Sequence, residues 1–146
     1  MSAYSTVVVG TDGSDSSYRA VDRAGAIAGA AGAKLIVATA YFPENNPHSA
    51  DVLKDDAYKV TGKAPVYDIL RTARERAAAA GATSVEERSI EGAPVDALLD
   101  LVVDSKADLL VVGNVGLNTI AGRLLGSVPS DVARRSRCDV LIVHTT

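Results

Sequence analysis

The sequence has a single cysteine, Cys138, and no tryptophan. One cysteine excludes an internal disulfide, a redox pair of thiols and a zinc site built from several cysteines. Cys138 precedes an apolar run, so we expect it to act as a small buried hydrophobic residue. Aromatic residues make up only 4% of the chain, although 47% of it is hydrophobic. The core must therefore consist of Val, Ile, Leu and Ala, which favours a parallel sheet covered by alanine-rich helices.

The chain also lacks an excess of basic charge and a long apolar run. Its formal net charge is −3, which argues against nucleic-acid binding. Arg134, Arg135 and Arg137 cluster where a helix is expected to end, and there they oppose the negative end of its dipole. No run approaches the roughly 18 apolar residues of a membrane span, and residues 1–10 do not have the pattern of a signal peptide. We therefore expect a cytoplasmic protein with no membrane partner.

Five short apolar runs predict strands within a single domain over residues 1–146. They are Thr6–Gly10, Lys34–Ala40, Ser84–Ile90, Leu109–Gly113 and Val140–His144. Four of the runs are continuously aliphatic. Ser84–Ile90 instead alternates with charged residues, so we expect it at an edge of the sheet.

Apolar stripes with helical spacing separate these strands. They run from Ala20 to Ala31, from Val66 to Ala77 and from Val95 to Val103, and a short fourth helix is expected from about Ser127 to Ser136. The alternation predicts an α/β fold with a doubly wound five-stranded parallel sheet, in the order 3-2-1-4-5, with helices on both faces. We interpret Pro43–Ala64, which is poor in apolar residues, as a mobile excursion that orders over a ligand site.

Two glycine-containing segments follow the first and fourth strands. Gly10-Thr11-Asp12-Gly13-Ser14 follows the first, while Gly113-Asn114-Val115-Gly116 follows the fourth and leads to Gly126-Ser127 at the start of the last helix. Ligands of open parallel sheets bind beyond the carboxyl ends of the strands, where the strand order reverses. The two segments are therefore expected to line one crevice.

The residue types in this crevice suit a nucleotide. The N–H groups of Gly126 and Ser127 at a helix start form an anion site. The Asp12 carboxylate can accept hydrogen bonds from ribose hydroxyls, and Val9 and Ala40 can wall a flat base. Each glycine alone is more simply explained by a turn, and Asp12 by an Asx turn or a helix cap. Only their joint spacing favours a ligand.

The spacing of Gly113, Gly116, Gly126 and Ser127 fits the pattern G-2x-G-9x-G-[S/T], and Val7–Ser14 is similar to an opening strand and loop of the same kind. On these motifs the chain resembles the ATP-binding universal stress proteins over nearly its whole length. The resemblance implies an adenine nucleotide alpha hydrolase-like fold, ATP or AMP with Mg²⁺ accompanying ATP, and dimers. It places Thr11, Asp12 and Ala40 near base and ribose, and Gly113, Gly116, Gly126, Ser127 and Val128 near phosphates and ribose. We also count Gly10 among the nucleotide-binding residues.

The chain departs from the family at two places. Many members carry a basic residue where this chain has Asn114 and Val115, and a small polar residue or alanine where it has Pro129, which cannot donate an N–H. Arg123 is the only cation within the glycine loop, and we include it among the nucleotide-binding residues. The missing basic residue and Pro129 both weaken the binding of a triphosphate. AMP or cyclic AMP therefore becomes an alternative ligand to ATP.

Other functional classes lack their residues here. Neither a P-loop nor a G-x-G-x-x-G segment after the first strand is present, and a receiver domain would need further acids beside Asp12. His48 and His144 lie away from the glycine segments, so no base is placed on a nucleophile. We therefore expect a regulatory protein that senses or buffers nucleotide. A slow ATPase and a ligand-free interaction domain are the alternatives.

The last predicted strand, Val140–His144, lies at a sheet edge in the expected order. It carries no charge or proline from Val140 to Val143, the usual devices that protect an edge. We expect a homodimer joined through this strand, as the family resemblance also implies. Cover by the fourth helix and a loop of the same chain is the alternative.

Overall fold

The computed structural model describes residues 3–42, 63–114 and 127–145 and contains the predicted alternation of strands and helices. The strands are β1 (Thr6–Gly10), β2 (Lys34–Tyr41), β3 (Val85–Glu91), β4 (Leu109–Gly113) and β5 (Asp139–Val143), and the helices are α1 (Asp15–Ala31), α3 (Lys63–Ala80), α4 (Pro94–Ser105) and α5 (Ser127–Arg135). All neighbouring strands are parallel, in the order β3-β2-β1-β4-β5. The predicted fold class is confirmed.

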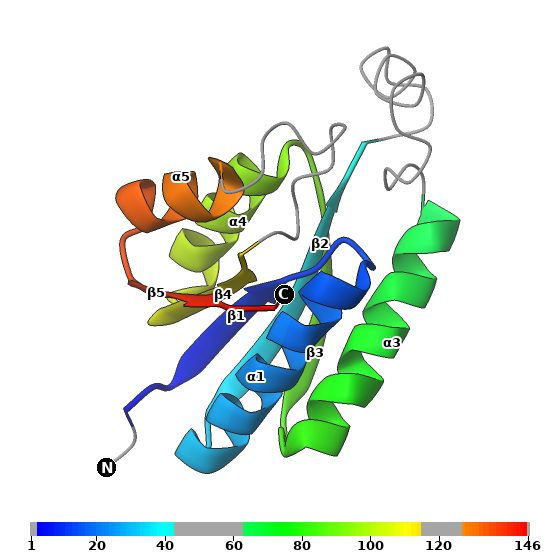
Figure 1. Ribbon diagram of the computed structural model, residues 1–146, viewed down its shortest axis with the longest axis vertical. Coiled ribbons are helices and arrows are strands. Elements are labelled where there is room, and N and C mark those ends of the chain that lie inside the picture. Colours follow the sequence, from blue (N-terminus) through cyan, green and yellow to red (C-terminus); the bar gives the residue numbers. More distant parts are fainter. Residues whose placement is uncertain (1–2, 43–62, 115–126, 146) are drawn as a thin grey trace.

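Figure 1 shows the sheet between two helical layers, with α1 and α3 on one face and α4 and α5 on the other. Consecutive residues of β1 alternate between the layers. Val7 and Val9 belong to the cluster beneath α1 and α3, whereas Val8 belongs to the cluster beneath α4 and α5. All three valines are fully buried because both faces of the sheet are covered. This two-sided burial explains the unbroken aliphatic runs in the sequence.

The predicted edge strand lies at the edge, one residue later than expected. Among the described strands, β3 pairs only with β2. Its charged residues make ion pairs along this edge: Glu86 with Nζ of Lys34 at 2.8 Å, and Glu87 with Nε of Arg74 on α3 at 3.1 Å. The hydrogen bond from Lys34 holds the pKa of Glu86 below its usual value. The charged residues of β3 therefore reflect an edge strand in which no residue is fully buried.

The boundaries of two helices differ slightly from the expectation. The α3 helix begins at Lys63, so the last two residues of Pro43–Ala64 are helical. Pro65 is tolerated there because first-turn N–H groups have no partner within the helix. Residues 43–62, and with them the expected closure over the site, lie outside the described residues. The α5 helix ends at Arg135, one residue early.

The helices α1 and α3 approach each other closely through two glycines. A Cβ added to Gly25 would lie 2.6 Å from the carbonyl oxygen of Ala77, and one added to Gly29 would lie 2.3 Å from that of Gly81. Real Cβ atoms do not approach backbone oxygens so closely. No sequence pattern predicted this contact, although it fixes the spacing of the helical layer that covers β1 and β2.

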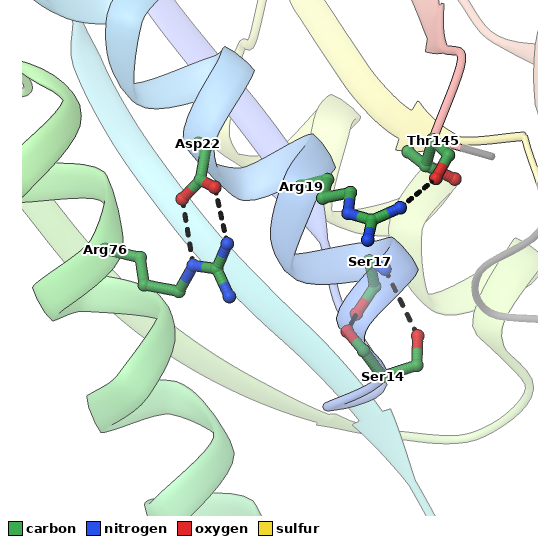
Figure 2. Close-up of polar contacts among 6 residues, drawn as sticks. All are labelled: Ser14, Ser17, Arg19, Asp22, Arg76 and Thr145. Atoms are coloured by element: carbon green, nitrogen blue, oxygen red, sulfur yellow. Dashed lines mark hydrogen bonds and ion pairs between the residues drawn. The ribbon is translucent and has the colours of Figure 1, made fainter.

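Arg76 ties the same two helices together at the surface. Its Nε donates to Oδ1 of Asp22 at 2.9 Å, and its guanidinium lies 5.2 Å from the centroid of the Tyr18 ring. Figure 2 shows the Asp22–Arg76 pair between the helices. Because the ion pair is partly exposed, it adds little to the stability of the protein. Together with the ring contact, it holds α1 and α3 in one relative orientation.

Cys138 and the arginine cluster have local structural roles. Cys138 is half-buried against the cluster beneath α4 and α5, and burial raises the pKa of its thiol. Arg134 and Arg135 lie in the last turn of α5, as expected, and pair with Asp131 and Asp96 at 2.9 and 3.1 Å. In the three described segments, no helix is long and apolar enough to cross a membrane.

Candidate functional site

The two predicted segments start from strands that lie side by side. The β1 and β4 strands pair in parallel, with Val9 opposite Val111. Gly10 and Gly113 therefore lie at the same end of the sheet, where the carboxyl ends of these central strands meet. The helix after β1 covers one face, and the helix after β4 covers the other (Figure 1). This is the point where the strand order reverses, and ligands of such sheets bind there.

Internal hydrogen bonds hold the turn between β1 and α1. The Thr11 side chain is fully buried, and its hydroxyl lies 2.7 Å from Oγ of Ser17 and accepts the Gly13 N–H at 3.1 Å. The Ser17 hydroxyl donates to the carbonyl of Ser14 at 3.0 Å, so Thr11 is the donor toward Ser17. The Thr11 N–H donates to the Ala38 carbonyl on β2 at 2.9 Å. A contact of Thr11 with base and ribose stays a prediction.

Asp12 has a role within this turn. Its Oδ1 accepts the Ser14 N–H at 2.9 Å, which is an Asx turn. Ser14, and not Asp12, caps the helix, because its Oγ accepts the Ser17 N–H at 3.1 Å (Figure 2). Of the two structural roles considered for Asp12, the turn is therefore the one observed. The predicted contact between its carboxylate and ribose would exist alongside this turn.

Gly13 is required in this turn by its backbone conformation. Its φ is +85°, and an added Cβ would lie 3.0 Å from Cγ1 of Ile69 on α3. We expect Gly13→Ala to lower the free energy of unfolding by about 2 kcal/mol, measured by urea denaturation, through left-handed strain and this contact. Gly32→Ala is the control, since its φ is +67° but nothing lies within 4 Å. Equal losses in the two variants would show that Ile69 moves aside without cost.

The prediction that Val9 and Ala40 wall a base together is wrong for Val9. Val9 is fully buried in the cluster beneath α1 and α3. Ala40 alternates with Thr39 along β2 and so faces the same side as Ala38, which belongs to the cluster beneath α4 and α5. Ala40 is half-buried there, and Val128 of α5 joins the same cluster. A base on the α5 side of the crevice could reach Ala40 but not Val9.

The end of β4 is filled on its α1 side. Gly113 is buried, and a Cβ added to it would lie 3.4 Å from Cγ2 of Thr145 and 3.6 Å from Oγ of Ser16. Asn114 turns toward the same residue, because its Oδ1 accepts the N–H and the hydroxyl of Thr145 at 2.9 and 2.8 Å. The expectation that His144 lies away from the glycine segments is wrong, since its Nδ1 is 3.5 Å from Nδ2 of Asn114. No motif in the sequence pointed to Ser16 or Thr145. Their position leaves the α5 side of Gly113 as the approach for a ligand.

The other predicted site residues lie within or next to residues 115–126, which the structure does not describe. Gly116, Arg123 and Gly126 lie outside the described residues, and Ser127 is the first residue of α5. The predicted anion site at the first N–H groups of α5 stays a prediction. Over residues 3–42, 63–114 and 127–145, no three His, Cys, Asp or Glu side chains are grouped to hold a metal ion.

A family model described as the universal stress protein family matches residues 3–144 of the chain. The chain belongs to the universal stress protein family. One family relative, universal stress protein Rv1636 of Mycobacterium tuberculosis strain H37Rv, is 70% identical over 100% of both chains. A universal stress protein of Thermus aquaticus is 31% identical, covering 97% of this chain and 99% of its own length.

A solved structure supports the same membership. The crystal structure of a universal stress protein in complex with cAMP is 66% identical to this chain. It covers 99% of this chain and 100% of its own, with a TM-score of 0.78. The family predicted from the spacing of the glycines is confirmed, whereas the individual contacts of the predicted site residues stay predictions.

Proposed function

We propose that this universal stress protein binds an adenine nucleotide at the carboxyl ends of the neighbouring strands β1 and β4. The observation that carries the proposal is the cAMP complex of a relative 66% identical over nearly the whole chain. The local structure fits such a ligand. Gly10 and Gly113 end adjacent strands, and Ala40 is half-buried. The first N–H groups of α5 would bind the phosphate.

Within this class we propose cyclic AMP or AMP over ATP with Mg²⁺. Asn114 carries no positive charge for a phosphate, and its side-chain oxygen is held by Thr145. Pro129 lies in the first turn of α5 and contributes no N–H there. Both features reduce the favourable contacts available to the extra charge of a triphosphate.

We propose a regulatory role in the cytoplasm, in which the protein senses or buffers nucleotide without turning it over. Thr11, Ser14 and Ser17, the hydroxyl residues of the β1–α1 turn, are bonded to one another. None of them is paired with a histidine in the described residues, as an activated nucleophile would be. The alternative is slow ATP hydrolysis. A turnover number above about 1 per second would place the protein among ordinary enzymes and overturn the binding role.

Calorimetry tests the nucleotide directly. The wild-type protein should bind cyclic AMP, AMP and ATP with Mg²⁺, with ATP the weakest of the three, and should not bind GTP. Absence of heat for every adenine nucleotide at millimolar concentration would overturn the proposal and favour a ligand-free interaction domain.

Asp12→Asn separates the turn role of Asp12 from its proposed ribose contact. Asparagine keeps an oxygen that can accept the Ser14 N–H, so the Asx turn should persist. It replaces the other oxygen by an amide donor, so a carboxylate bond to a ribose hydroxyl should weaken. We expect about tenfold weaker AMP binding by calorimetry.

The matched ligand for this test is 2′-deoxy-AMP. It lacks the 2′-hydroxyl, so the loss caused by Asp12→Asn should shrink if the carboxylate contacts that group. An equal loss with both ligands would contradict the ribose contact at this position.

We also propose that two copies pair through β5. Among the described strands β5 pairs only with β4, which leaves its other edge available. The α5 helix packs on β5, yet Ile142 remains 41% exposed. This exposure weighs against complete cover of the edge by α5. A two-fold partner that offers the same strand in antiparallel orientation would satisfy the backbone groups and bury Ile142.

A further inference from the structure

Thr145 lies two residues beyond β5 and is only 4% exposed although it is polar. Its N–H and hydroxyl donate to Oδ1 of Asn114 at 2.9 and 2.8 Å. Its carbonyl oxygen accepts a hydrogen bond from Nη1 of Arg19, as Figure 2 shows, and its hydroxyl contacts the hydroxyl of Ser16. We call Ser16, Arg19, Asn114 and Thr145 the Thr145 clasp.

Every polar group of Thr145 is used in the clasp. A hydroxyl has one hydrogen, and that of Thr145 goes to Asn114, so Ser16 is the donor in the contact between the two hydroxyls. The N–H of Asn114 donates in turn to the Val143 carbonyl at 2.9 Å. The clasp therefore joins α1 to the ends of β4 and β5, and it pairs the N–H, hydroxyl and carbonyl of the buried Thr145.

The clasp lies directly against Gly113 and Asn114, the first two residues of the predicted nucleotide-binding segment. Thr145 and Ser16 fill the α1 side of Gly113, and Asn114 is the residue from which the chain continues toward Gly116. We propose that the clasp positions Gly113 and Asn114 for the nucleotide, and that Thr145 is a positioning residue of this site. This inference rests on the proposed function.

The physical advantage of the clasp is preorganisation. A glycine-containing segment loses much conformational freedom when it becomes ordered around a ligand. Hydrogen bonds already fix Asn114, so less conformational entropy is lost when the ligand binds. The clasp can therefore raise affinity although Thr145 does not touch the ligand. Because the clasp occupies the α1 side, it also directs the ligand to the opposite side of the sheet, which Ala40 faces.

The opposite end of the sheet supplies a matched control. There the carboxylate of Asp108 accepts the N–H of Ser5 at 2.9 Å and that of Thr6 at 3.0 Å, which fixes the start of β1 beside β4. Asp108 precedes β4, the strand that the clasp also holds, but it lies at the end away from Gly10 and Gly113. Its loss should lower stability without touching the site.

The test compares Thr145→Val, Thr145→Ser and Asp108→Asn in the full chain, with cyclic AMP affinity measured by calorimetry and stability by thermal unfolding. Valine keeps the shape of threonine but lacks the hydroxyl, so we expect about three- to tenfold weaker binding. Serine restores the hydroxyl and should bind within about twofold of the wild type. Asp108→Asn should lower the melting temperature and leave the affinity unchanged. Arg19→Met, which removes the bond to the Thr145 carbonyl from an exposed position, should weaken binding in the same direction and carries the test if Thr145→Val fails to fold.

The outcomes separate this inference from the proposed function. A wild type that binds no adenine nucleotide overturns both. A wild type that binds, with Thr145→Val or Arg19→Met of equal affinity, overturns the positioning role alone. An affinity loss in Asp108→Asn as large as that in Thr145→Val overturns it too, because general destabilisation would then explain the effect. Loss in Thr145→Val with rescue by Thr145→Ser supports it.

Discussion

Replacing Gly29 by alanine is expected to lower the free energy of unfolding by about 3 kcal/mol, a large overpacking effect. The new Cβ would lie 2.3 Å from the carbonyl oxygen of Gly81 and 2.6 Å from its carbon. Both are backbone atoms, which cannot rotate away as a flexible side chain would. The helices α1 and α3 must therefore separate, and the buried alanines between them, such as Ala28 and Ala77, lose contact with their neighbours.

The control for this prediction is Ala30→Gly, at an exposed position of the same helix. It should lower stability by about 1 kcal/mol through helix propensity. Propensity alone would make Gly29→Ala stabilising by a similar amount, so the two mechanisms predict opposite signs at Gly29. Urea denaturation followed by circular dichroism measures both variants. A more stable Gly29→Ala protein would contradict the close contact.

Ile142→Lys is expected to convert the proposed dimer to a monomer. A two-fold axis through paired β5 strands brings residue 142 of each copy to the same interface, so one substitution places two positive charges there. Like charges and their desolvation should cost about 4 kcal/mol, which raises the dissociation constant about a thousandfold. Light scattering at micromolar concentration should give about twice the 15.0 kDa chain mass for the wild type and a single chain mass for the variant.

Val103→Lys provides the matched control for the dimer. Val103 is 53% exposed on α4, an apolar surface position like Ile142 but not on β5. This variant should remain dimeric. A wild type that stays monomeric at high concentration would rule out the interface, and loss of the dimer in Val103→Lys would place it elsewhere on the molecule.

The fold was predictable because each element carries its own pattern. A strand covered on both faces must be apolar at every position, as in Val7–Val9, whereas the edge strand Val85–Glu91 is mostly charged and none of its residues is fully buried. Helix ends were equally local, since the αL conformation of Gly32 closes α1 through neighbouring carbonyls. Once strands and helices alternate, right-handed crossovers and the usual packing leave few possible strand orders.

The site was predictable only in part, for a related reason. The spacing of the glycines predicted a ligand site after β1 and β4, and the structure places the ends of these two strands side by side. The direction of individual side chains was harder to foresee. Val9 and Ala40 both end apolar runs, yet they face opposite layers because their positions in neighbouring strands differ in parity.

The sequence by itself determined the α/β class, the strand order and the family, because these follow from patterns within short segments. Only the tertiary structure decided that Gly29 meets Gly81 and that Thr145 closes over Gly113 and Asn114. These residues are far apart in the chain, and each by itself is an ordinary glycine or threonine. Their roles arise from the distance and register between packed elements, where a shift of a few tenths of an ångström separates a contact from a clash.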